Sequence, residues 1–206
     1  ATGTYILPLD ADDTIEPDYI PRAVEALRHA PKAGLCYCHA DFIGEQTGAW
    51  GLPDFTMARM LTDNVIFVTA LIRREAMAQV GGFDESFRTG MEDYDFFLSL
   101  LEKGWEILQL PQTLFHYRIK PVSRSTRLTG DNRDYRAVYQ RLYDKHRALY
   151  QENMDAVFPA MREELLTQRA KALEQTQRAI TLENELNRYQ SVRYLVKQLW
   201  NWRLHR

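Results

Sequence analysis

The sequence predicts an α/β fold, a mixed β-sheet with flanking helices, followed by an all-helical C-terminal region. Over the first part of the chain, short apolar runs typical of strands alternate with segments whose apolar residues recur every three or four positions. Glycines and prolines separate these segments. Residues 131–206 contain one proline, Pro159, and no glycine, and are rich in residues that favour long helices. We therefore expect two regions, 1–125 and 126–206.

The first elements follow from their apolar pattern and their end signals. Residues 5–9 predict a buried strand that ends at Asp10. Pro17 then opens a helix that continues to about Ala30, because proline fits the first turn of a helix. The next expected elements are a strand, a helix, a strand and a short helix, at 35–42, 57–61, 65–72 and 74–80. Gly81 and Gly82 end the last of these.

The α/β region is expected to end with a helix and two strands. Residues 92–103 carry apolar side chains at helical spacing, and Gly104 fits a C-terminal cap. Residues 105–110 and 114–119 have the pattern of strands, broken by Pro111.

The composition is that of a globular protein, since 45% of the 206 residues are apolar. The formal net charge of −2 gives no general attraction to nucleic acid, so we expect no nucleic-acid partner. Cys36 and Cys38 are too few for a disulfide framework, and we expect both, together with His39, in the core. No apolar run is long enough to span a membrane, and no signal peptide opens the chain. We therefore expect a cytoplasmic protein.

The charge is unevenly distributed along the chain. Residues 188–206 contain five basic residues and no acid, so the residues before them carry −7. The first 21 residues contain five carboxylates and no basic side chain: Asp10, Asp12, Asp13, Glu16 and Asp18. Because these carboxylates repel one another, we expect a cation among them.

Three of these carboxylates, Asp10, Asp12 and Asp13, follow the first expected strand. Ligands of open α/β sheets bind beyond the carboxyl ends of the strands, so these side chains are expected to face a site. Carboxylate oxygens suit Mg2+ or Mn2+ and leave room on the ion for phosphate oxygens. The alternative is a helix cap, which Asp13 or Thr14 could supply.

A second acidic group, Glu92-Asp93-Tyr94-Asp95, begins a helix after Gly90. The helix dipole stabilises acids at the start of a helix, so this structural role alone can explain the presence of one of them, Glu92 or Asp95. A carboxylate at the start of a helix beside a glycine loop also suits a general base, because it can point into a cleft from a fixed scaffold.

A third group is cationic. Alternation along the strand at 114–119 puts His116, Arg118 and Lys120 on one face. Such a row suits a pyrophosphate, to which arginine can make paired hydrogen bonds. A solvent-facing edge strand would have the same pattern.

Taken together, these segments resemble the later part of the catalytic domain of family 2 glycosyltransferases, the inverting GT-A type. The strand that ends in Asp10-Ala11-Asp12-Asp13 is similar to the DXD motif of that family. Residues 80–85 and 92–96 are similar to its acceptor-side segment, and Tyr117-Arg118 with Ser123 and Ser125 to its closing strand and loop. The resemblance implies a partial GT-A fold, which is a nucleotide-diphospho-sugar transferase-like fold.

The resemblance also implies an activity, the metal-dependent inverting transfer of a sugar from a nucleotide-sugar to an acceptor hydroxyl. Asp12 and Asp10 would ligate Mn2+ or Mg2+. Asp13, His116 and Arg118 would contact the nucleotide-sugar or its diphosphate. By resemblance, the setting is bacterial surface polysaccharide biosynthesis, with a glycan or a lipid-linked glycan as acceptor.

On the acceptor side, the resemblance makes Asp93 the catalytic base and Glu92 the alternative base. This sequence departs from the family's pattern at two points. Lys120 occupies a position where members often carry a histidine, and the nucleotide-binding half that opens the family's domain has no counterpart before Ala1. We therefore expect that these 206 residues do not transfer sugar alone.

Two alternative functions remain from the sequence. The segment Asp10-Ala11-Asp12-Asp13-Thr14 also fits the DxDx[TV] signature of haloacid-dehalogenase-type phosphatases, with Asp10 as nucleophile. A non-catalytic alternative is a helical module that docks on a partner through residues 160–206. Its basic end alternates with aromatic and aliphatic residues, which is typical of a helix in a membrane interface. We expect either peripheral contact with the inner face of the membrane or a homo-oligomer, with a coiled coil as one form.

Overall fold

The computed structural model describes residues 2–87, 90–120 and 132–204, and it divides the chain into two compact units, Ala1–Val157 and Phe158–Arg206. The first unit is built on a six-stranded sheet with the order β1-β5-β3-β6-β2, and β4 pairs with β3 outside this path. Its strands are β1 (Tyr5–Ile6), β2 (Thr14–Ile15), β3 (Ala33–Gly44), β4 (Gly48–Ala49), β5 (Leu71–Arg73) and β6 (Glu106–Ile119). β3 and β6 pair in parallel and the other pairs are antiparallel, so the sheet is mixed.

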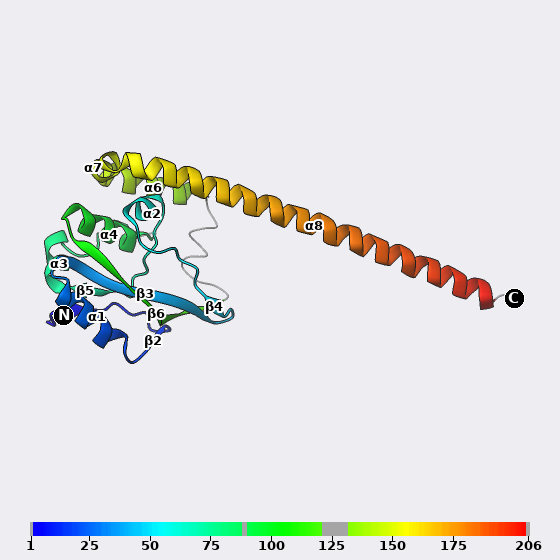
Figure 1. Cartoon of the computed structure of the whole chain (residues 1–206), viewed down its shortest axis with the longest axis horizontal. Helices are drawn as coiled ribbons and strands as arrows, with labels where there is room; N and C mark the ends of the chain where they lie inside the picture. The colour runs from blue at the N-terminus through cyan, green and yellow to red at the C-terminus, as the bar shows by residue number, and fades with distance from the viewer. Residues whose placement is uncertain (1, 88–89, 121–131, 205–206) are drawn as a thin grey trace. The chain divides into compact units, whose positions relative to one another are not determined.

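Helices flank this sheet, and Figure 1 shows α1 on one side of β3 and β6 and α4 on the other. The helices of the first unit are α1 (Tyr19–His29), α2 (Met57–Thr62), α3 (Arg74–Val80), α4 (Glu92–Glu102), α6 (Asn132–Lys145) and α7 (Arg147–Glu152). α8 (Met154–Leu204) begins in the first unit and makes up the second. The predicted fold, a mixed sheet with flanking helices and a helical C-terminal region, is confirmed.

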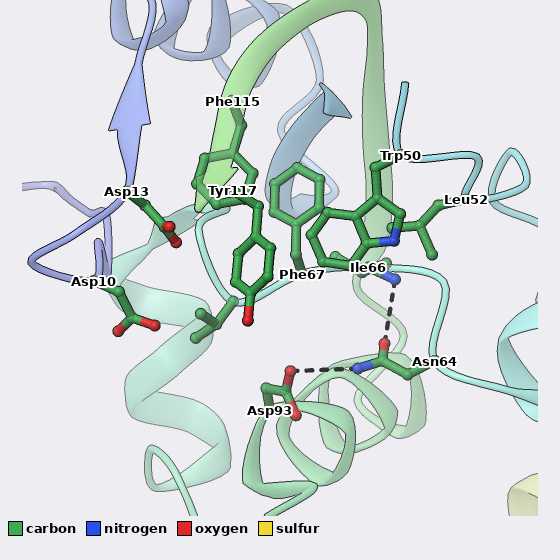
Figure 2. Close-up of a pocket in the computed structure, with 11 residues that line it drawn as sticks. Asp10, Asp13, Trp50, Leu52, Asn64, Ile66, Phe67, Asp93, Phe115 and Tyr117 are labelled. Atoms are coloured by element: carbon green, nitrogen blue, oxygen red, sulfur yellow. Dashed lines mark hydrogen bonds between the residues drawn. The ribbon is translucent and has the colours of Figure 1, made fainter. Parts of the chain in front are cut away.

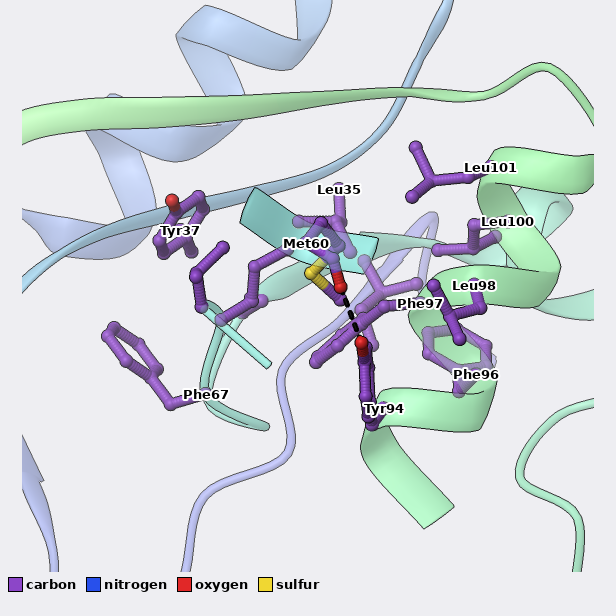
Figure 3. Close-up of a cluster of buried hydrophobic side chains, with 14 of the residues drawn as sticks. Leu35, Tyr37, Met60, Phe67, Tyr94, Phe96, Phe97, Leu98, Leu100 and Leu101 are labelled. Carbon is purple, nitrogen blue, oxygen red and sulfur yellow. Dashed lines mark hydrogen bonds between the residues drawn. The ribbon is translucent and has the colours of Figure 1, made fainter. Parts of the chain in front are cut away.

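The core lies around β3 and α4, because both are apolar on most of their surface. Residues 33–38 of β3 are all buried, and so are residues 94–98, 100 and 101 of α4 (Figure 3). The Tyr94 hydroxyl donates to the Met60 carbonyl at 2.5 Å, so the one polar atom that this ring brings into the core is satisfied. Cys36 and Cys38 are buried, as predicted, and burial raises the pKa of their thiols to about 12 and about 11. The prediction that His39 also lies in the core is wrong, because its side chain is exposed and lies 3.5 Å from Asp54.

Three strand predictions are wrong in their extent. The expected buried strand 5–9 pairs only at Tyr5 and Ile6, both partly buried, and Leu9 is exposed. Of the expected strand 65–72, only Leu71 and Ile72 pair in the sheet, because the preceding residues make local bonds, such as that from the Ile66 N–H to the Asn64 side chain. The apolar run suggested a strand because most of these residues are buried, although they do not pair in the sheet. Pro111 does not break β6, which is continuous from Glu106 to Ile119. The register between β3 and β6 shifts between Leu110 and Thr113, so the proline sits where the ladder is irregular.

The C-terminal helices α6 and α7 belong to the first unit. Val138, Leu142, Leu149 and Tyr150 are buried in its core. The packing therefore puts the division after Val157, later than the expected division at 125/126. Composition marks where helices begin, but it does not say which surface they pack against.

A group of charges joins α6 and α7 to α4. Asp95 is 2% exposed and accepts from Lys145 Nζ at 2.8 Å, and the same lysine lies 2.8 Å from Asp84. The fully buried His146 puts Nε2 3.0 Å from Asp95. A buried carboxylate needs such partners, because its charge is costly without them.

α8 exposes large apolar side chains along its length, including Leu173, Leu186 and Trp200. Among the residues that the structure describes, no helix combines the length and the apolar character that crossing a lipid bilayer requires.

The charge group around Asp95 predicts a large loss of stability. Asp95→Ala leaves Lys145 and His146 without their shared carboxylate and should lower the free energy of unfolding by roughly 3 kcal/mol. Asp144→Ala is the matched control. It breaks an ion pair with Arg147 in which both side chains are half exposed, and should change stability by less than about 0.5 kcal/mol. Urea denaturation at pH 7 measures both, and equal losses would contradict the structural role of Asp95.

Candidate functional site

A pocket of about 290 Å3 brings together two of the acidic groups that are far apart in the sequence. In Figure 2, Asp10 and Asp13 lie on one side of it and Trp50 and Leu52 on the other, and Asp93, at the start of α4, faces Asn64. Its lining residues are Asp10, Asp13, Trp50, Leu52, Asn64, Ile66, Phe67, Val68, Asp93, Phe115 and Tyr117. Apolar walls with a few convergent polar groups are typical of a ligand site.

Asp13 is the buried carboxylate of the acidic loop. It is 8% exposed and accepts the backbone N–H of Arg118 at 2.8 Å. Burial raises its pKa, the neighbouring charges of Asp12 and Asp10 add to this, and the Arg118 N–H opposes it. β2 pairs with the end of β6, which holds the loop between β1 and β2 against that strand.

Asp10 and Asp12 differ in their surroundings. The Asp12 carboxylate lies 2.6 Å from Lys120 Nζ, and this bond lowers its pKa. Asp12 is not among the residues that line the pocket. Asp10 lines it, is exposed, and has no side-chain bond to another described residue. The structure therefore places Asp10, rather than Asp12, with Asp13 at the pocket.

His116 and Arg118 face the acidic loop and do not line the pocket. His116 puts Nδ1 2.5 Å from Asp41 and Nε2 3.0 Å from Glu16. Burial works to lower its pKa, but the bonds to these two carboxylates outweigh burial and raise it. Arg118 Nε donates to the Asp12 carbonyl at 2.8 Å. Basic side chains of the chain itself thus supply much of the positive charge that we expected among the five carboxylates.

Asp93 lies in the first turn of α4, and the residue before that helix, Met91, has a left-handed φ of 69°. Asp93 Oδ1 accepts the Tyr94 N–H at 2.8 Å, and Oδ2 accepts from Asn64 Nδ2 at 3.3 Å. Burial raises the pKa of Asp93, and the charge of Glu92 adds to the rise. A half-buried carboxylate with a raised pKa suits a group that takes up a proton. Glu92 is itself partly buried and is not among the pocket residues.

The sequence did not point to Asn64 or, apart from Tyr117, to the aromatic wall. Trp50 stacks with Phe67 at 5.8 Å between ring centroids and lies 5.0 Å from Tyr117. Phe115 packs against Phe67 at 4.6 Å. For the rest of this wall the signal was a tryptophan in a loop rich in glycine, and Asn64 has none beyond its place after a short helix. Ser123 and Ser125, which share in the family resemblance, lie outside the described residues.

The carboxylates at the pocket fit a hard divalent cation. Asp10 and Asp13 offer oxygen ligands, which Mg2+ and Mn2+ prefer. Asp12 could join them only if its ion pair with Lys120 opened. Within the described part of the chain, no three His, Cys, Asp or Glu side chains are grouped to hold a metal. Such an ion would therefore take other ligands from a bound phosphate and from water.

Two curated relatives match the chain. The O-antigen biosynthesis protein RfbC of Myxococcus xanthus is 26% identical over 161 residues, which is 77% of this chain and 12% of the relative. An uncharacterised protein y4gI of Sinorhizobium fredii is 30% identical over 128 residues, which is 60% of this chain and 14% of the relative. The chain thus matches only about an eighth of the length of these relatives.

Among solved structures, S. aureus TarS 1–349 in complex with UDP-GlcNAc has a TM-score of 0.48 at 14% identity, covering 61% of this chain and 38% of that one. A second structure, of S. aureus TarS, has a TM-score of 0.45 at 14% identity and covers 73% of this chain and 29% of that one. A protein-family model described as glycosyltransferase like family 2 matches residues 1–152. This match covers well over half of the chain, which therefore belongs to glycosyltransferase-like family 2, as its motifs predict.

Proposed function

We propose that the chain, as part of a longer protein, transfers a sugar from a nucleotide-sugar donor to an acceptor hydroxyl with inversion at the anomeric carbon. The observation that carries this proposal is the meeting of Asp93 with Asp10 and Asp13 at one pocket. Family membership supplies the reaction class, and the pocket supplies a base on one side and carboxylates for a cation on the other.

In this mechanism Asp93 is the general base. The acceptor oxygen forms a bond to the anomeric carbon while the bond from that carbon to the leaving diphosphate breaks, and the hydroxyl proton passes to the Asp93 carboxylate. Attack from the face opposite the leaving group inverts the anomeric configuration and needs no covalent intermediate. The raised pKa of Asp93 favours this proton transfer, because a base works best when its pKa approaches the working pH.

On the donor side, Asp10 and Asp13 would hold Mg2+ or Mn2+, with Asp12 joining if Lys120 releases it. Such an ion neutralises negative charge on a departing diphosphate. His116 and Arg118 support this side indirectly, because they fix Glu16, Asp41 and the Asp12 carbonyl around the acidic loop. A direct contact of either cation with the diphosphate remains a proposal that needs these bonds to rearrange.

The biological setting that we propose is surface polysaccharide biosynthesis, with a glycan or lipid-linked glycan as acceptor. The name of the Myxococcus relative, an O-antigen biosynthesis protein, supports it. Because the chain corresponds to a small part of its relatives, we also propose that the isolated 206 residues do not complete the transfer. Measurable sugar transfer by the isolated chain would contradict this.

We propose that residues 160–206 bind a partner, either an anionic membrane surface or a second copy of the chain. The exposed apolar side chains of α8 and the basic charge of residues 188–206 support this. Co-sedimentation with anionic vesicles should fall when residues 188–206 are removed if the partner is a membrane. Equal sedimentation of both forms, together with a loss of mass in light scattering on truncation, identifies the second copy instead.

The base role predicts opposite effects of one substitution on activity and stability. Asp93→Asn should reduce sugar transfer by the longer protein roughly 10²- to 10⁴-fold, since it cannot accept the proton. The same change should increase stability at pH 7. The folded pKa of Asp93 lies above its unfolded value, so ionising it costs free energy of folding as the pH rises through that interval.

The stability gain should therefore vanish below about pH 4, where the carboxyl is protonated in both states. Glu92→Gln is the control on the neighbouring carboxylate and should leave most of the activity in place. Thermal unfolding at pH 3 and pH 7, beside transfer assays, tests both effects. Full activity of Asp93→Asn would exclude Asp93 as the base.

The cation site predicts weak Mn2+ binding that depends on Asp10. Asp10→Asn should weaken Mn2+ binding by at least about tenfold, since the side chain lost would be a direct ligand. Asp18→Asn, in the same acidic segment but paired with Arg22 at 2.5 Å, is the control and should bind Mn2+ like the wild type. Electron paramagnetic resonance of free Mn2+ gives the affinities, and equal affinities for all three proteins would remove Asp10 from the site.

A further inference from the structure

Asn64 lies just after α2 and lines the pocket beside Asp93. We propose that it is a positioning residue for Asp93, one that holds the carboxylate in a single orientation and favours its ionised form. The proposal rests on the proposed function, in which Asp93 is the base. Figure 2 shows the two side chains facing each other across the start of α4.

The amide of Asn64 has one favourable orientation. Its Oδ1 accepts the backbone N–H of Ile66 at 3.2 Å, and its Nδ2 donates to Asp93 Oδ2 at 3.3 Å. A flipped amide would put its NH2 group against the Ile66 N–H and its carbonyl oxygen against a carboxylate, so both contacts would become repulsive. The Ile66 backbone therefore determines that a donor faces the base.

The two carboxylate oxygens of Asp93 accept hydrogen bonds from different segments of the fold. Oδ1 accepts the Tyr94 N–H within α4, and Oδ2 accepts from Asn64 after α2. Each oxygen keeps further capacity to accept, because an ionised carboxylate offers about four lone-pair directions. The carboxylate is thus fixed in its plane and still able to take a proton from a bound hydroxyl.

Asn64 is itself well supported. Its backbone N–H donates to Asp63 Oδ1 at 2.8 Å, and the same oxygen accepts from the Tyr139 hydroxyl of α6 at 2.5 Å. The bond from the Tyr94 hydroxyl to the Met60 carbonyl ties α4 to the end of α2. Adjacent residues of α4, Asp93 and Tyr94, thus both bond to the segment that carries Asn64, which limits the movement between donor and base.

The charge balance at Asp93 gives this contact a chemical consequence. Burial and the charge of Glu92 favour the protonated form of Asp93, whereas the donors of Tyr94 and Asn64 favour the ionised form. A base must be ionised before it can act. Losing Asn64 should therefore leave a larger share of Asp93 protonated, and inactive, at a given pH.

Two variants of Asn64 test the proposal on the isolated chain without any substrate. Asn64→Ala removes the donor, and Asn64→Asp keeps an acceptor for the Ile66 N–H while placing a second carboxylate against Asp93. Carboxyl carbon NMR follows the ionisation of Asp93 as the pH changes. We expect its midpoint to rise by about one pH unit in Asn64→Ala and further in Asn64→Asp.

Asn153→Asp is the matched control. Asn153 is also a partly buried asparagine whose amide donates, to the Leu149 carbonyl at 2.8 Å, but it ends α7 and does not line the pocket. Its variant should leave the Asp93 midpoint unchanged. Circular dichroism establishes that each variant is folded. If Asn64→Ala unfolds, Asn64→Asp still decides, because its local backbone bond is retained.

The outcomes separate this proposal from the proposed function. A raised Asp93 midpoint in the Asn64 variants supports the positioning role even if the longer protein transfers no sugar, a result that would overturn the base role alone. If transfer is measured, the acidic limb of the kcat/KM profile should move upward by about the same one pH unit. An Asp93 midpoint that stays within about 0.3 pH units of the wild type in both variants overturns the positioning role.

Discussion

The parallel pairing of β3 with β6 is the constraint on which the site depends. Its register runs from Ala33 to Gly44 and sets Asp41 opposite His116, while β2 pairs with the same stretch of β6 from the other side. Phe115 and Tyr117 of the aromatic wall, and the backbone N–H that holds Asp13, come from the end of β6. A change of register by one residue would turn these side chains to the opposite face of the sheet, so the carboxylates and the wall would no longer meet.

Much of the architecture could be predicted because local signals agreed with the packing. Glycine caps, helical spacing and the apolar β3 segment place α1, α3, α4 and β3 close to their observed bounds. The motifs around Asp10 and Asp93 also indicated the family, and membership of that family removes the phosphatase alternative for Asp10. These features depend on residues near one another in the sequence or on a spacing shared by many proteins.

What could not be predicted depends on contacts between distant segments. The Asn64 bond to Asp93 joins α2 to α4, and nothing in the residues around position 64 marks it. The partners of Asp12 and His116 likewise lie far from them in the sequence, on β3 or just after β2 and β6. Composition showed a helical C-terminal region but not that α6 and α7 complete the core of the first unit. Periodicity describes one element at a time, whereas burial of these helices depends on a surface contributed by α4.

The two buried thiols of β3 make it possible to follow the opening of this central strand by chemical modification. Cys36 and Cys38 are buried, and their raised pKa values keep nearly all of each thiol protonated, so alkylating reagents find neither access nor thiolate while the strand is paired. Modification must then wait for an opening of β3, which is bonded on both sides. The labelling rate of these cysteines therefore reports how often the middle of the sheet comes apart, separately from any fraying at the helices.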